Sequence, residues 1–196
     1  LKEYEAVKSQ AQSFENKLWT KRILHLVGGE GENEENTIFN YLQSAGNALE
    51  NNSFGAKQKT FRKFYDETII TESFGLIQNQ VNAGLAIINV FGHSNSNFTQ
   101  YGIDDVSIYS NKGKYPLFIS GGCYSGTCSN DVPALGESIT LASEKAGICY
   151  LGVSGFGFIS SLGSFMNAFY TNIGTEHYGL SIGDALIKTH NDINSG

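Results

Sequence analysis

Residues 85–91 read Leu-Ala-Ile-Ile-Asn-Val-Phe, and Gly92-His93-Ser94 follows directly. A short, nearly continuous apolar run is typical of a strand that is buried on both faces, as in parallel sheets. The glycine and the polar residues after it favour a turn, so the strand ends there. The sequence therefore predicts a buried strand over 85–91 whose carboxyl end presents His93.

Similar apolar runs lie on both sides of this strand, and helical patterns separate most of them. Strands are predicted at 23–27, 115–120 and 147–153, with an extended edge segment at 56–65. Helices are predicted over 36–49, 72–82, 134–145, 160–172 and 181–192, after a lead-in helix in residues 1–20. Strands that alternate with helices predict an α/β fold, in which helices cover both faces of a mainly parallel sheet.

The composition is that of a globular domain. The chain has 196 residues, of which 40% are hydrophobic and 16% charged, so it can bury a core and is not a disordered tail. The formal charge of -6 argues against nucleic acid as a partner, because a polyanion is bound by a basic surface. No run approaches the roughly 18 apolar residues that a membrane helix needs. Leu1 begins neither a signal peptide nor a natural start, so we interpret residues 1–196 as a single domain from a longer protein.

Reactive side chains follow three of the predicted strands: the glutamates of 30–35, His93 and Cys123. Parallel strands end at the same edge of a sheet, so His93 and Cys123 can meet there, as a thiol nucleophile and its base require. Considered singly, a histidine in such a turn more often forms structural hydrogen bonds, and a cysteine after a strand more often packs in the core. Glycine precedes both residues and lets a ligand approach the backbone closely, and together they favour a catalytic site.

The order of these segments resembles the gingipain family of cysteine peptidases, within the caspase-like superfamily, which includes signal peptidases of the type IX secretion system. The resemblance rests on two hydrophobic strands, one followed by Gly92-His93 and the other by Cys123. Further similar segments lie at 18–24, 135–137, 146–154 and 181–186, so nearly the whole chain is covered. The resemblance implies a caspase-like three-layer sandwich over residues 1–196, as a single catalytic domain.

The resemblance also implies a mechanism. Cys123 would attack a peptide carbonyl as a thiolate and form an acyl-enzyme, while His93 passes a proton to the leaving amine. The backbone amides of Ser94 and Cys123 would form the oxyanion hole. An acidic residue that orients the histidine would come from the loop after the first strand, where Glu30 or Glu32 is the matching position. We choose Glu30. The alternative is that the glutamates of this loop are only solvated surface charges.

The resemblance also implies a protein or peptide substrate, bound by Phe91, Gly122, Ser154 and Phe156. No acidic residue lies between Glu144 and Glu176, so we expect the primary pocket to take an apolar or small side chain rather than arginine or lysine. The predicted function is a cysteine endopeptidase, either general or signal-cleaving and sortase-like. From the resemblance, we expect it to be secreted or held at a bacterial cell surface.

Two other functions stay open. An inactive caspase-like domain could bind partners or act as a scaffold in a secreted bacterial protein, and Ser94 favours this because relatives usually have glycine there. A metal-dependent hydrolase could use His93, Cys123 and Cys128, but the spacing of further zinc ligands is missing, and we predict no catalytic metal.

The thiol mechanism requires no cofactor. Segment 30–35 and Asp104-Asp105 offer clustered oxygens, and relatives often carry structural calcium, so a calcium ion stays open beside solvated charge. Two residues inside apolar runs are predicted to be structural. Cys149 is expected to pack in the core, and His25 is expected to be a hydrogen-bonded interior histidine.

Overall fold

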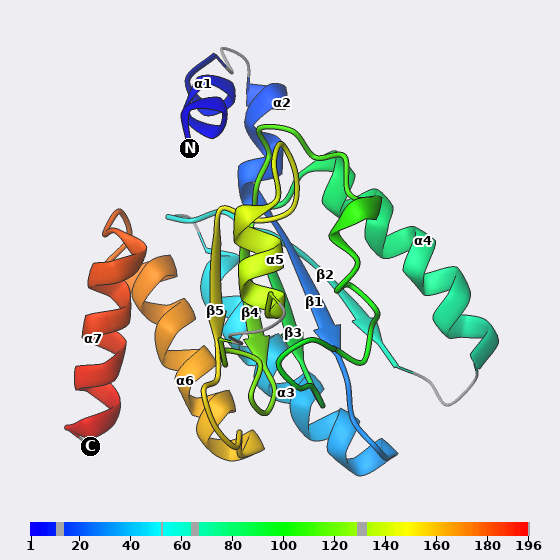
Figure 1. Ribbon diagram of the computed structural model, residues 1–196. Coiled ribbons are helices and arrows are strands. Elements are labelled where there is room, and N and C mark those ends of the chain that lie inside the picture. Colours follow the sequence, from blue (N-terminus) through cyan, green and yellow to red (C-terminus); the bar gives the residue numbers. More distant parts are fainter. Residues whose placement is uncertain (11–13, 52, 64–66, 129–132, 196) are drawn as a thin grey trace.

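The computed structural model describes residues 1–10, 14–51, 53–63, 67–128 and 133–195. Within them, one parallel sheet has five strands in the order β2-β1-β3-β4-β5. The strands are β1 (Arg22–Val27), β2 (Lys57–Arg62), β3 (Ile87–Phe91), β4 (Leu117–Gly121) and β5 (Cys149–Gly152). Their carboxyl ends all lie at one edge of the sheet, the lower edge in Figure 1. The predicted strands and the edge position of β2 are confirmed.

Helices cover both faces of the sheet, so the predicted three-layer sandwich is confirmed (Figure 1). One layer contains α3 (Glu32–Leu49), α6 (Ile159–Thr171), which continues into η3 (Asn172–Glu176), and α7 (Ile182–Asn194). The other contains α4 (Glu67–Ala83), the short η2 (Val106–Ile108) and α5 (Leu135–Leu141). Among the described residues, no helix is long and apolar enough to cross a membrane.

The core explains why the central strands read as unbroken apolar runs. Alternate residues of each strand point to opposite faces. On one face, Leu24, Ile88 and Phe118 are buried in one cluster with Val81 of α4 and Ile139 of α5. On the other face, a second cluster joins the strands to α3 and α6; its buried strand residues are Ile23, Ile87, Leu117 and Ile119. Each central strand is therefore buried on both sides.

Some helix bounds differ from the predictions for local reasons. α3 begins at Glu32 rather than at residue 36, because acidic side chains suit the positive end of a helix and form its first turn. α5 ends at Leu141 rather than at residue 145, and the chain then turns through Glu144 and Ala146, whose φ values are 61° and 64°. The lead-in segment forms α1 (Lys2–Gln10), α2 (Phe14–Lys17) and η1 (Leu18–Lys21), while residues 11–13 lie outside the described part.

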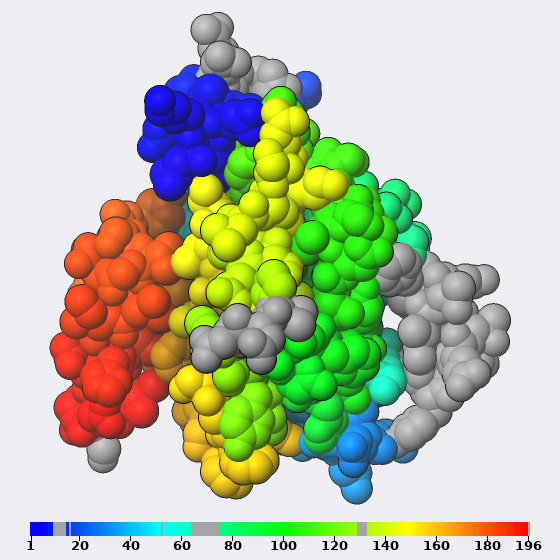
Figure 2. Space-filling view, viewed as in Figure 1, coloured from blue at the N-terminus to red at the C-terminus, as the bar shows by residue number. Residues whose placement is uncertain are grey.

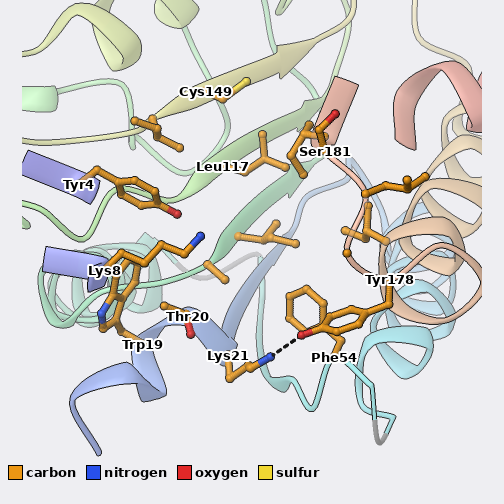
Figure 3. Close-up of a pocket in the computed structure, with 17 residues that line it drawn as sticks. Tyr4, Lys8, Trp19, Thr20, Lys21, Phe54, Leu117, Cys149, Tyr178 and Ser181 are labelled. Atoms are coloured by element: carbon orange, nitrogen blue, oxygen red, sulfur yellow. Dashed lines mark hydrogen bonds between the residues drawn. The ribbon is translucent and has the colours of Figure 1, made fainter. Parts of the chain in front are cut away.

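Cys149 is exposed, so the packing role predicted for it is wrong. β5 is the last strand in the sheet order, and an apolar run does not by itself reveal that its strand lies at an edge. Cys149 lines a cavity of about 590 Å³ at the amino ends of the strands, with Tyr4, Trp19 and Phe54 among its walls (Figure 3). This cavity lies at the opposite end of the sheet from His93 and Cys123.

His25 is fully buried in the middle of β1, as predicted for an interior histidine. Its Nε2 lies 3.3 Å from the hydroxyl of Tyr170, and Asn89 Nδ2 donates to the same hydroxyl at 3.1 Å. Burial disfavours the charged imidazolium and lowers the pKa of His25 from 6.5 to about 4. The folded protein therefore holds this histidine neutral well into the acid range.

This burial predicts a specific loss of stability in acid. Below pH 6.5 the unfolded chain binds a proton at His25, whereas the folded chain binds it only near pH 4, so the free energy of unfolding falls as the pH drops through this window. His25→Gln removes that proton. Urea unfolding at pH 7.5 and pH 4.5 should show the wild type losing about 2 to 3 kcal/mol more than the variant. Equal losses in the two proteins would contradict the assignment.

Candidate active site

The site begins with the pairing of β1, β3 and β4. Phe91, the last residue of β3, pairs with Val27 of β1 on one side and with Gly121 of β4 on the other. His93 and Cys123 each lie two residues beyond this paired row. The strand order also reverses at β1, with β2 on one side and β3 on the other, and ligands of open α/β sheets bind beyond the strand ends at such a point.

This end of the molecule is open to solvent. Figure 2 shows the light-green turn after β4, the yellow-orange loop before α6 and the light-blue start of α3 along the lower end of the molecule. The His93 side chain is 45% exposed, and Cys123 is partly exposed. Both predicted reactive groups are thus accessible from the same surface.

A glutamate that the sequence analysis did not select makes the shorter contact with His93. The imidazole Nε2 lies 3.3 Å from the carboxylate of Glu34 and 3.9 Å from Oε1 of Glu30. Glu34 sits in the first turn of α3, and its Oε2 also accepts the backbone N–H of Glu30 at 2.7 Å. The available signal was the group of glutamates at 32, 34 and 35, because acidic residues suit the first turn of a helix that begins before residue 36.

Glu34 carries its charge beside the imidazole. Burial alone raises the pKa of this carboxyl, but the Glu30 N–H and the His93 imidazole together lower it by more. The net result is a pKa below the usual range for glutamate, so Glu34 is ionised at neutral pH. A carboxylate in this position orients a histidine ring and stabilises its protonated form.

The remaining acidic groups have other partners. Glu35 is buried and pairs with Arg62, whose Nε lies 2.6 Å from its Oε1. Asp104 accepts the backbone N–H of Thr99 at 3.3 Å, and Asp105 caps η2. Across the described ranges, no three His, Cys, Asp or Glu side chains are grouped as metal ligands. Structural calcium therefore stays a prediction, with no ligand cluster to hold it in this part of the chain.

Cys123 lies in a turn that is fastened to the loop between β5 and α6. The turn's backbone N–H groups at Tyr124 and Gly126 donate to Gly155 O and Val153 O, each at 2.8 Å. The Cys123 Sγ accepts a hydrogen bond from the backbone N–H of Gly157 at 3.4 Å, and the carbonyl oxygen of Gly157 lies 3.8 Å away. The sulfur is thus held at a fixed place, with a backbone donor directed at it.

The turns after β3 and β4 touch each other through Ser94. Its hydroxyl donates to the carbonyl oxygen of Cys123 at 3.0 Å. Gly122 lies beneath this contact, and a Cβ there would sit 2.1 Å from Ser94 Oγ and 2.6 Å from Gly92 O. The two turns can approach this closely because residue 122 has no side chain.

The residues predicted to bind substrate fall into two groups. Ser154 and Phe156 are exposed, and Phe156 packs edge-to-face against Tyr124, with ring centroids 4.9 Å apart. Phe91 is only 1% exposed and packs with Val27 and α3, so the prediction that its side chain binds substrate is wrong. As the end of a strand that is buried on both faces, it faces the core. Tyr124, next to Cys123, was missed.

The close approach of the two turns predicts contrasting effects of two glycine substitutions. Gly122→Ala should lower the free energy of unfolding by about 1 to 3 kcal/mol, because the new methyl group overlaps Ser94 and the Gly92 carbonyl. Gly155→Ala, in the neighbouring loop, meets nothing within 4 Å and should be nearly neutral. Urea unfolding of both variants checks this, and an equal cost would show that the turns are not packed as described.

Comparisons with known proteins show the family and the fold of the chain. The model of peptidase family C25 matches residues 1–196. The structure of the pro- and mature domains of RgpB from Porphyromonas gingivalis superposes with a TM-score of 0.69 at 16% identity, covering 91% of this chain and 44% of that one. The Arg-specific cysteine proteinase gingipain R gives 0.63 at 15% identity, covering 91% and 43%.

A further structure, described as a protease, gives a TM-score of 0.73 at 16% identity and covers 100% of this chain and 46% of that one. Comparison with curated proteins gives no match. The chain thus spans less than half the length of each of these three solved structures, and at these identities they share its fold. The match of the family model over the whole chain goes further: the chain belongs to peptidase family C25, the gingipain family.

Proposed function

We propose that this domain hydrolyses peptide bonds, with Cys123 as the nucleophile and His93 as the general acid and base. One observation carries the proposal. The two residues follow the adjacent, paired strands β3 and β4, beside the point where the strand order reverses, and an ionised glutamate lies 3.3 Å from the imidazole. Membership of peptidase family C25 supports the same class of chemistry.

The proposed reaction has two halves. The Cys123 thiolate attacks the scissile carbonyl carbon, a carbon–sulfur bond forms, and the carbon–nitrogen bond breaks as the protonated His93 gives its proton to the leaving amine. A water molecule then attacks the thioester and gives a proton to His93, the carbon–sulfur bond breaks, and the carboxylic acid and the Cys123 thiolate are released. The backbone amides of Ser94 and Cys123 are proposed to bind the oxyanion in both halves.

Glu34 is proposed to support His93 throughout this cycle. Its carboxylate holds one ring nitrogen, which leaves the other free to serve the reacting groups. The negative charge also stabilises the imidazolium that forms when His93 accepts a proton. We assign this role to Glu34 ahead of Glu30, because Glu30 is further from Nε2 and its side chain is 79% exposed.

The surface beside Cys123 favours an apolar substrate side chain. Tyr124 and Phe156 form an exposed aromatic pair, 39% and 72% exposed, in the two loops that hold the thiol. The sequence from 145 to 175 contains no acidic residue to pair with arginine or lysine. We therefore propose that Phe156 contacts an apolar side chain of a protein or peptide, with Gly122 and Ser154 lining the backbone path.

The proposed site suits two kinds of cysteine peptidase. A general secreted endopeptidase and a signal-cleaving, sortase-like peptidase both need a thiol that forms an acyl-enzyme, and they differ in whether water or an amine accepts the acyl group. Our proposal places the protein outside the cytoplasm, secreted or at a bacterial cell surface, on the strength of its family.

A covalent reagent tests the proposed nucleophile. Peptidyl acyloxymethyl ketones with phenylalanine, aspartate or arginine at the terminal position should label Cys123, and the phenylalanine reagent should react fastest. His93→Ala should slow labelling about a hundredfold or more, and Cys123→Ala should abolish it. Intact mass and peptide mapping give the site, with Cys149→Ala as the matched control that keeps the wild-type rate.

A specific result of the labelling experiment would contradict the proposed peptidase function. If no reagent labels Cys123 while iodoacetamide alkylates it at the rate of an ordinary thiol, the domain is inactive. The alternative function, a binding or scaffold domain in a secreted protein, would then replace the peptidase.

Two conservative substitutions distinguish the roles of the two glutamates beside His93. Glu34→Gln should lower kcat more than about tenfold, because it removes the charge that stabilises the imidazolium. Glu30→Gln removes the same charge at a greater distance, and its kcat should stay within about twofold of the wild-type value. Steady-state kinetics on a peptide identified by the labelling series gives the ranking, and the reverse order would transfer the role to Glu30.

A further inference from the structure

One side chain outside the predicted site contacts both loops that present the histidine and its glutamate. Gln100 lies beyond the turn that begins at His93, and its Oε1 accepts two backbone N–H groups, that of Gly29 at 2.9 Å and that of His93 at 3.1 Å. Its Nε2 donates to the carbonyl oxygen of Gly29 at 3.3 Å. One carboxamide therefore joins the loop after β1 to the loop after β3.

The backbone around this carboxamide is shaped to receive it. A Cβ on Gly28 would lie 2.1 Å from Gln100 Oε1, and a Cβ on Gly92 would lie 2.6 Å from the same oxygen. The two glycines also approach each other, because a Cβ on Gly28 would lie 3.0 Å from Gly92 Cα. Any larger residue at either position would displace the oxygen that holds the His93 amide.

The chain on both sides of Gln100 is fixed independently. Thr99 bridges to Ser94 across the turn, and Asn95 N donates to Phe98 O at 3.1 Å. The buried Tyr101 hydroxyl lies 2.6 Å from the carbonyl oxygen of Val27, at the end of β1, and donates to it. Gln100 is thus held from both directions while its carboxamide reaches the two loops.

We propose that Gln100 is a positioning residue that sets the imidazole of His93 against Glu34. It acts through the backbone: the same oxygen holds the His93 amide and the Gly29 amide, next to the loop from which α3 and Glu34 begin. This inference rests on the proposed function for its effect on turnover. The effect of Gln100 on the orientation of the His93 imidazole can be measured separately, because it does not depend on whether the domain is active.

Gln100→Met tests this role, because methionine preserves the volume and removes every hydrogen bond. The variant should lower kcat about tenfold to a hundredfold, as expected for a displaced catalytic group, with KM within about twofold of the wild type. Gln100→Glu keeps an oxygen acceptor in place, and its kcat should fall less than that of Gln100→Met. Gln43→Met, on the exposed face of α3, where Gln43 donates to Asn47, is the matched control and should change neither constant.

A spectroscopic readout separates this inference from the peptidase proposal. The ¹⁵N signal of His93 Nε2 should move in Gln100→Met toward its position in Glu34→Ala, where the contact is removed, and should stay in Gln43→Met. That shift supports the positioning role even if the wild type cleaves no peptide, which would overturn only the proposed function. An unchanged Nε2 signal, a wild-type kcat in an active enzyme, or an equal loss in Gln100→Glu would overturn the role of Gln100.

Discussion

The structure depends on the parallel pairing of β1, β3 and β4 in one register. Val27, Phe91 and Gly121 form the last paired row, and the Gly28 N–H continues the ladder to Phe91 O beyond it. Because all three strands end at this row, their loops begin side by side over one edge. The glutamate, the histidine and the cysteine come from segments far apart in the sequence, and this register is what brings them together.

Above that row, hydrogen bonds between loops replace the ladder. Gln100 joins the β1 and β3 loops, Ser94 joins the β3 and β4 loops, and Gly157 bonds the sulfur of Cys123. Each bond has at least one backbone partner, so each one fixes the position of the main chain in its loop. Below the row, two apolar clusters fix the strands from both faces. A rigid base with a cross-linked upper layer is the arrangement that acyl transfer requires, since small displacements of the reacting groups are costly.

Much of the fold could be predicted from the sequence because its signals are local. Apolar runs ended by glycine predicted the strands, and the placement of His93 and Cys123 at strand ends followed from them. The predictions failed where the answer depended on the sheet order or on the start of a helix. Cys149 lies on an edge strand, which an apolar run does not reveal, and Glu34 became visible only once α3 was seen to begin at Glu32.

Phe91 shows a different kind of error, because the strand that contains it was already predicted to be buried on both faces. Its nearness to His93 in sequence suggested a role in substrate binding that its burial contradicts. Gln100 and Tyr124 had no signal in the sequence at all. Their roles come from contacts between loops, and such contacts exist only once the strands are placed in order.

We propose that the turns after β3 and β4 together form one acyl-transfer site. The most direct measurement is a crystal structure of the protein after reaction with a phenylalanyl acyloxymethyl ketone. We expect a thioether bond to Cys123 Sγ, the ketone oxygen about 3 Å from a backbone N–H of these turns, and the phenyl ring against Phe156. A reagent attached to Cys128 or Cys149, or one on Cys123 whose oxygen points into solvent away from both turns, would contradict it.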